Sequence, residues 1–233
     1  MPPLHVDIWS DIACPWCYVG KRRFEKALSK FSQRAAVQVT WRAFELNPSA
    51  PNEEPEGNYS ERLAKKYRTS TSDAEAMIAR LTDIAKTEGL DFDFTTIRPG
   101  NTFDAHRLLH LAQAHGLQDA VKERLLRAYF CEGEAIGDHE TLLRVSAETG
   151  LKTDLARTVL ESDSYADEVR EDETIARDLG INGVPFFVVA ERYGISGAQT
   201  PEVLLQVLEQ AQQAIVEPTA EYSEGAHCGP EGC

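Results

Sequence analysis

The chain alternates apolar and polar side chains near its start, and the spacing then changes to that of a helix. Residues 4–11, LHVDIWSD, alternate with a period of two, which predicts a strand. Residues 17–31 repeat apolar side chains at helical spacing, and residues 36–44, AVQVTWRAF, alternate again. Residues 4–44 therefore predict a β-α-β unit, whose strands are parallel because a helix connects them.

The rest of the chain has a helical pattern until a second extended region near its end. Residues 45–58 are rich in Pro, Asn, Gly and acidic residues, and they end the first unit. Residues 59–179 are almost entirely helical in spacing, whereas residues 183–197 contain two short extended runs around a turn. Residues 200–216 predict a last helix with Pro201 at its start. The order is β-α-β, a set of helices, and β-β-α.

This order predicts an α/β fold into which a large all-α domain is inserted. We assign residues 1–46 and 181–216 to the α/β domain and residues 47–180 to the inserted helical domain. Residues 217–233, which are acidic and contain Gly and Pro, predict a flexible tail with a C-x4-C motif.

Composition and charge argue against several classes of function. The 233 residues have a formal net charge of −14, which opposes binding to nucleic acid or anionic membranes. No apolar run approaches the roughly 18 residues of a membrane span. The first residues lack the pattern of a signal peptide, so we expect a cytoplasmic protein, either a monomer or a dimer. In a reducing compartment the five cysteines are more typical of catalysis, metal binding or free thiols than of permanent disulfides.

The segment SDIACPWCYVG, residues 10–20, places two cysteines three positions apart at the start of the predicted helix. There the unpaired N–H groups and the helix dipole favour a thiolate, so we expect the pKa of Cys14 to fall below about 8.5. Pro15 suits the first helical turn. Cys17 lies on the same helical face and can attack a mixed disulfide formed at Cys14. The alternative for a C-x2-C motif is half of a zinc site, which needs a second pair of ligands.

The segment NGVPFFVV, residues 182–189, contains a Val–Pro step before the second extended region. Only about 5–6% of X–Pro bonds are cis, so Pro185 by itself is also consistent with a plain strand-entry proline. At this position the backbone of Val184 is a candidate for pairing with an extended substrate segment.

Together these motifs resemble the DsbA-like thioredoxin-fold proteins and, within them, the FrnE-like branch of disulfide oxidoreductases. The resemblance spans nearly the whole chain, through DIACPWCYVGKRRFEKAL, NTFDAHRLLHLA, AYFCEGEAIGD, GINGVPFFV and ISGAQTPEVL. It implies a thioredoxin domain interrupted by a helical domain. It also implies that Cys14 is the nucleophile, Cys17 the resolving thiol and Pro185 a cis-proline facing the reactive sulfur.

The resemblance also implies that NTFDAHR and GAQ line the cleft near the dithiol. The candidate site-tuning or substrate-binding residues are therefore Pro15, Trp16, Val184, Asn101, His106 and Gln199. The chemistry needs no bound cofactor, and we predict no metal site in the catalytic centre. The expected partners are protein thiols and disulfides or low-molecular-weight thiols, without nucleic acid or membrane. Whether the protein oxidises, reduces or isomerises is left open.

Two other functions are kept as alternatives. The 2-hydroxychromene-2-carboxylate isomerases and kappa-class glutathione transferases resemble this chain in fold, but they typically have serine at the first active-site position. The two cysteines here favour dithiol exchange, while glutathione stays a candidate partner. A metal-handling protein that uses the tail thiols is the second alternative.

The tail pair Cys228 and Cys233 is predicted to exchange disulfide with the CPWC pair as a tethered relay. The 12 residues from Val216 to Cys228 reach about 40 Å when fully extended, enough to return to the CPWC site. Two alternatives stay open: a metal site that includes His227, and a disordered end with incidental thiols.

Overall fold

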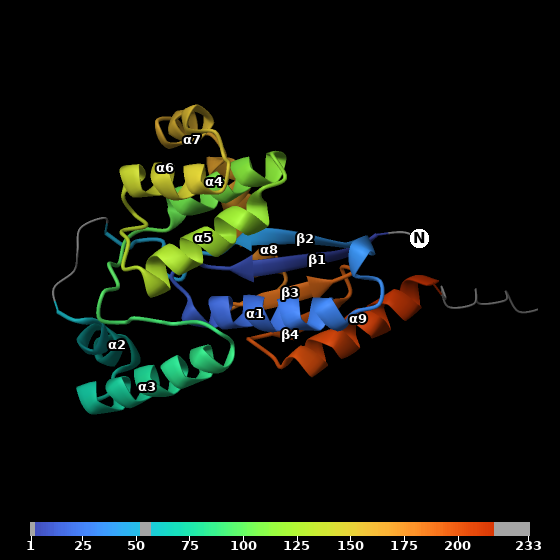
Figure 1. Ribbon diagram of the computed structural model, residues 1–233, viewed down its shortest axis with the longest axis horizontal. Helices are drawn as coiled ribbons and strands as arrows, with labels where there is room; N and C mark the ends of the chain where they lie inside the picture. The colour runs from blue at the N-terminus through green and yellow to red at the C-terminus, as the bar shows by residue number, and fades with distance from the viewer. Residues whose placement is uncertain (1–2, 52–56, 217–233) are drawn as a thin grey trace, which may run out of the picture.

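The computed structural model of the protein describes residues 3–51 and 57–216 (Figure 1). At its centre is a mixed four-stranded sheet with the strand order β2-β1-β3-β4. Strand β1 pairs in parallel with β2 and antiparallel with β3, and β3 pairs antiparallel with β4. The strands are β1 Leu4–Ser10, β2 Val37–Ala43, β3 Phe186–Val189 and β4 Tyr193–Ser196.

Two helices cover one face of the sheet. Helix α1 (Pro15–Lys30) and helix α9 (Pro201–Val216) lie side by side in front of the strands in Figure 1 and contact each other. The alternating side chains of β1 point toward them, which explains the period of two in the sequence. The core on this face includes Leu4, Val6, Ile8, Phe24, Phe187, Leu204 and Leu208. On the other face Trp9 packs with Ala176 and Ile181.

The helices between β2 and β3 form what we call the helical block. They are α2 Tyr59–Tyr67, α3 Thr71–Thr87, α4 Phe103–Ala114, α5 Gln118–Cys131, α6 His139–Glu148, α7 Thr153–Leu160 and α8 Ala166–Asp178. Helices α2 and α3 pack as a pair, apart from α4–α7 (Figure 1). Residues Ile12, Tyr18 and Val19 belong to the same apolar core as the block. The start of α1 is therefore packed against the helical block.

Polar side chains of the helical block also hold the edge strand β2. The amide of Gln118 makes two hydrogen bonds of 2.9 Å with the backbone of Trp41, one through each of its polar atoms. Asp172 of α8 accepts hydrogen bonds from the Ala43 N–H at 2.8 Å and from Arg42 at 3.0 Å. These contacts satisfy backbone groups that an edge strand otherwise leaves unpaired.

The element order confirms the predicted α/β fold, with β-α-β and β-β-α halves on either side of a set of helices. The division at residues 46/47 and 180/181 stays a prediction, as does the tail, which lies outside the described residues. Within residues 3–51 and 57–216, no helix combines the length and the apolar character needed to cross a membrane.

Candidate active site

The two cysteines of the CPWC motif lie where β1 runs into α1. The strand ends at Ser10, and Cys14 is the N-cap residue of α1, with extended backbone and with Pro15 at the first helical position. The Cys14 N–H donates to the Asp11 carbonyl at 3.4 Å, and the Cys17 N–H donates to the Cys14 carbonyl at 3.0 Å. Both thiols are free and buried. The turn therefore places a reduced dithiol at a helix N-terminus.

The loop before β3 closes over Cys14 from the other half of the chain. The Val184–Pro185 peptide bond is cis, and the Cys14 Sγ donates to the Val184 carbonyl oxygen at 3.5 Å. Helix α1 approaches this loop at Gly20, where a Cβ atom would lie 2.8 Å from the Pro185 Cγ. Real Cβ atoms do not come that close to carbon, so a glycine at position 20 permits the contact.

The two thiols do not ionise independently. Interaction with the Cys17 side chain, followed by burial, raises the pKa of Cys14 well above its ordinary value. Burial opposes ionisation of Cys17 too, but interactions with Cys14 and with the Lys122 ammonium outweigh it, and the pKa of Cys17 is lowered. After the first proton has left, the pair shares one proton and one negative charge.

This result contradicts the expectation of a lowered pKa for Cys14. A helix N-terminus carries only about half a positive charge, whereas Lys122 brings a full unit charge into a buried site on the Cys17 side. For Cys14 itself, the interaction with Cys17 and burial are the largest causes of the raised pKa, and Lys122 favours the thiolate at Cys17.

Lys122 of α5 is a buried charged residue beside the dithiol that the sequence did not reveal. Its side chain is fully buried, its Nζ donates to the Ser10 carbonyl at 3.2 Å, and it lies 5.6 Å from the centre of the Trp41 ring. Burial lowers the pKa of Lys122 to about 8, although the nearby Cys17 and Asp11 oppose that change. The one signal in the sequence is helical spacing, because Gln118, Leu125 and Leu126 share the buried face of α5.

A carboxylate and an imidazole complete the buried side of the dithiol. His106 of α4 and Asp11 are both about 1% exposed, and the His106 Nε2 lies 3.4 Å from an Asp11 oxygen. Burial opposes ionisation of Asp11, but hydrogen bonds from His106 and from the Leu46 N–H leave its pKa lowered. Burial lowers the pKa of His106, although the neighbouring Asp11 opposes that change. We call Asp11, His106 and Lys122 the buried polar cluster.

The other predicted residues are only partly brought together. Trp16 is 41% exposed beside Cys14. Asn101 donates to the carbonyls of Pro48 and Ala50 at 3.2 and 3.3 Å, so it fixes a loop instead of reaching the sulfurs. Gln199 donates to the Ser196 carbonyl at 2.9 Å, an exposed bond within its own turn. Cys228 and Cys233 lie outside the described residues.

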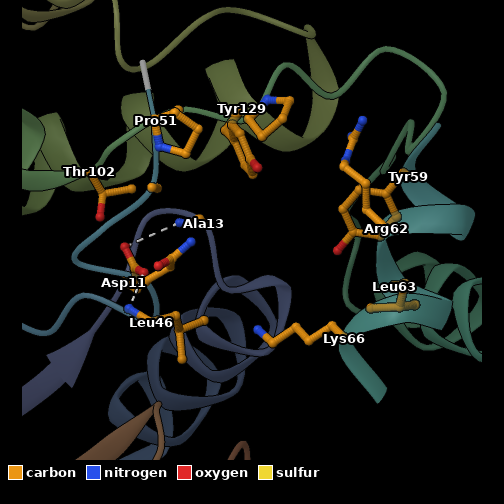
Figure 2. A pocket seen from close by; sticks show the side chains of 14 residues that line it. Asp11, Ala13, Leu46, Pro51, Tyr59, Arg62, Leu63, Lys66, Thr102 and Tyr129 are labelled. Carbon is orange, nitrogen blue, oxygen red and sulfur yellow. Dashed lines mark hydrogen bonds between the residues drawn. The ribbon is translucent and has the colours of Figure 1, made fainter. Parts of the chain in front are cut away.

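Two neighbouring cavities, which share several lining residues, open on the exposed side of the dithiol. One, of about 380 Å³, is bounded by the dithiol turn, Gly183 and Val184, and by side chains of α2 and α3; we call it the Cys14 groove. The second, of about 340 Å³, continues toward Asp11 and Thr102. Figure 2 shows Arg62 and Lys66 of α2 across this second cavity from Asp11 and Leu46. A capping box between Asn58 and Glu61 fixes the start of α2 and so positions these cations.

Within the part of the chain that the structure describes, no cluster of three or more His, Cys, Asp or Glu side chains has the arrangement of a metal site. The site combines a dithiol with an open apolar groove on one side and the buried polar cluster on the other. Sulfur chemistry is what these side chains supply.

The fold, with a dithiol at the N-terminus of its first helix, is of the thioredoxin type, and the chain belongs to the DSBA-like thioredoxin domain family, whose model matches residues 5–209. It is similar to the crystal structure of a probable DsbA oxidoreductase from Streptomyces coelicolor, with 42% identity, 99% of this chain and 98% of that chain covered, and a TM-score of 0.87.

More distant structures share the fold alone. The cytosolic disulfide reductase DsbM from Pseudomonas aeruginosa, solved with GSH, is 17% identical, with a TM-score of 0.63 and 90% and 99% of the two chains covered. A 2-hydroxychromene-2-carboxylate isomerase is 18% identical, with a TM-score of 0.62 and 92% and 97% covered. The comparisons confirm the DsbA-like resemblance; the FrnE-like subtype stays a prediction.

Proposed function

We propose that the protein is a thiol–disulfide oxidoreductase in which Cys14 attacks, Cys17 resolves, and the Val184–Pro185 loop positions the substrate. The observation that carries the proposal is the reduced Cys14 at the start of α1, with its Sγ 3.5 Å from the Val184 carbonyl beside the open groove. A substrate cysteine that pairs with this loop would lie next to Cys14.

The exchange uses the single charge of the dithiol. When Cys17 holds the shared proton, the Cys14 thiolate attacks a substrate disulfide: a Cys14–substrate S–S bond forms, and the leaving thiolate takes the electron pair and then a proton. Cys14 then carries no charge, and Cys17 loses its proton beside Lys122. The Cys17 thiolate attacks Cys14, the second substrate thiolate leaves, and the substrate is reduced by two electrons as the dithiol is oxidised. The reverse sequence oxidises a substrate.

The test is an insulin-reduction assay with dithiothreitol as the reductant. We expect Cys14→Ser to reduce the rate to the uncatalysed level, because no first attack occurs. Cys17→Ser should retain the first attack and accumulate a mixed disulfide, which mass spectrometry detects. Equal rates for the wild type and Cys14→Ser would reject the proposal.

The same variants separate the alternatives. A glutathione-dependent transferase or isomerase predicts saturable glutathione binding and activity that survives Cys17→Ser. A metal-handling protein predicts stoichiometric metal binding that is insensitive to Cys14→Ser. The likeness to the isomerase is one of fold, so it does not favour that reaction here.

We also propose, from the sequence, that Cys228 and Cys233 act as a relay for the CPWC pair. Support comes from their spacing and from the reach of the intervening chain. Replacing both with serine should slow oxidation or reduction of Cys14–Cys17 by large substrates. An unchanged turnover and an unchanged reduction potential would reject the relay.

A further inference from the structure

We propose that Arg23 of α1 is a positioning residue for thiol–disulfide exchange, because it fixes the turn that holds the Val184–Pro185 loop opposite Cys14. The inference rests on the proposed function, in which this loop positions the substrate. It is carried by a series of contacts that runs from Glu88, at the end of α3, through the Arg23 guanidinium to the loop.

The Val184–Pro185 loop is held by the turn that follows β4. This turn, residues 197–200, lies between the last residue of β4 and the start of α9, and we call it the supporting turn. The Gly197 N–H donates to the Pro185 carbonyl at 2.8 Å. A displacement of the supporting turn would therefore be transmitted to the loop that faces Cys14.

Arg23 holds the supporting turn against α1. Its Nη1 donates to the Ala198 carbonyl at 2.7 Å. Gly20 lies three residues earlier on the same face of α1, and a Cβ atom there would be 3.6 Å from the Ala198 Cβ. Among the described residues, the Arg23–Ala198 bond is the only side-chain hydrogen bond between α1 and the supporting turn.

The same guanidinium is held by the helical block. The Arg23 Nε donates to Glu88 at 2.7 Å, and the two side chains are only 19% and 8% exposed. Lys26 also donates to Glu88, so this carboxylate lies between two cations of α1. Glu88 is the C-cap residue of α3, a helix that lines the Cys14 groove. Arg23 thus joins three parts of the site: the dithiol helix, one wall of the groove and the supporting turn.

The planar shape of the guanidinium makes this junction directional. Because Nε and Nη1 belong to one rigid group, the bond to Glu88 fixes the direction in which Nη1 meets the Ala198 carbonyl. A misplacement of about 1 Å can slow a reaction on the order of 100-fold when the reacting atoms must be aligned. Loss of Arg23 should therefore slow the exchange with substrates that the loop aligns.

The experiment compares two disulfides that depend on the loop to different degrees. Insulin has a polypeptide backbone with which the loop can pair, whereas dithiobis(nitrobenzoate), a small aromatic disulfide, has none. We expect Arg23→Gln to lower kcat/KM for insulin about tenfold and to change the rate constant of Cys14 with dithiobis(nitrobenzoate) less than about twofold. Arg23→Lys should stay within about threefold of the wild type with insulin, because an ammonium can still donate to Glu88 or Ala198.

A double-variant cycle tests whether Glu88 acts through Arg23. Glu88→Gln should lower kcat/KM for insulin about threefold, and Arg23→Gln with Glu88→Gln should be no slower than Arg23→Gln alone, because one series of contacts carries both effects. The matched control is Arg22→Gln on the same helix, since Arg22 pairs with Glu25 and Glu123 and does not contact the supporting turn. This control should behave as the wild type does with both disulfides.

Amide hydrogen exchange locates the effect without any turnover. In Arg23→Gln the Gly197 N–H should exchange at least about tenfold faster, while the amides of β1 keep their wild-type rates. Faster exchange throughout the chain would assign Arg23 to general stability and would overturn the proposal.

Three kinetic outcomes would also overturn it: an unchanged insulin rate in Arg23→Gln, an equal loss with both disulfides, or an equal loss in Arg22→Gln. Failure of the proposed function is distinguishable. The wild type would then reduce insulin no faster than Cys14→Ser does, while the exchange of the Gly197 N–H would still report whether Arg23 holds the supporting turn.

Discussion

The two sulfurs of the dithiol lie in contrasting surroundings, although only two residues separate the cysteines in the chain. Cys14 is next to an open groove with apolar walls and cations at its edges. Cys17 is fully buried, on the side of the dithiol that Lys122, Asp11 and His106 occupy. The first environment can select a substrate, and the second can set the charge on the pair. Both are supplied largely by the helical block, so the inserted helices control a site whose sulfurs lie on α1.

The contrast predicts that changes on the two sides affect different measurements. Side chains of the groove should alter kcat/KM for particular substrates and leave the dithiol equilibrium unchanged. The buried polar cluster should alter ionisation, stability and reduction potential for every substrate alike.

The largest effect is expected for the stability of a Lys122→Met variant, measured in a chain whose Cys14 and Cys17 are both serine. At pH 6 the variant should have a free energy of unfolding about 2–3 kcal/mol higher, because it removes a buried cation. The folded-state pKa of Lys122 is about 8 with both cysteines present, below its ordinary value of 10.5, and serine at both positions removes two of the groups that raise it. The folded double-serine chain therefore loses this proton at or below about pH 8, whereas the unfolded chain keeps it to about pH 10.5, so the stability of the double-serine chain rises across that interval. The difference in free energy of unfolding between the variant and its parent should therefore shrink between pH 8 and 10.5. Urea unfolding at pH 6 and 9.5 measures this difference. A difference that does not change with pH would contradict the lowered pKa of Lys122.

The next effect is on the redox equilibrium of the intact dithiol. Lys122→Met should raise the pKa of Cys17 and weaken the reduced form, shifting the equilibrium with glutathione about tenfold toward the disulfide, or about 30 mV. Titration of the thiolate absorbance gives the pKa of Cys17, and equilibration in glutathione buffers gives the equilibrium constant with glutathione. The groove variant Met77→Ser is the control and should leave both unchanged. If it shifts them as much as Lys122→Met does, the separation of the two sides is wrong.

The smallest effect is expected for Asp11→Asn, with the opposite sign. Its carboxylate disfavours a thiolate nearby, so its loss should shift the glutathione equilibrium toward the dithiol. The change should be only about threefold, because hydrogen bonds from Leu46 and His106 already balance part of this charge. The exposed Asp163→Asn serves as the control. A shift in the same direction as Lys122→Met would show that packing, not charge, dominates.

The sequence predicted the elements that local patterns determine. The alternation before and after α1 predicted the parallel β1–β2 pair, and the Val–Pro step predicted the loop that closes over Cys14. These features depend on residues close together in the chain or on a recognisable motif.

What the sequence missed depends on contacts between distant segments. Lys122 lies in QDAVKERLLR, where a charged residue is typical of a solvated helical face, and only the packing of α5 on Trp41 shows it to be buried. The error about the pKa of Cys14 has a nearer cause, because the interaction with Cys17 in the same motif contributes most to the raised pKa, followed by burial. The groove needs α2 and α3 to be placed beside Trp16, and no local pattern gives that placement.

Position 20 offers a way to vary the distance between helix α1 and the Val184–Pro185 loop without altering any charge. It lies inside α1, where glycine costs about 1 kcal/mol relative to alanine, and its missing side chain admits Pro185. In a Gly20→Ala variant the added methyl group would lie too close to Pro185, so the Val184–Pro185 loop would move away from α1. The substitution adds and removes no ionisable group. The fit between the first and last thirds of this protein can thus be changed from a buried position that carries no ionisable group.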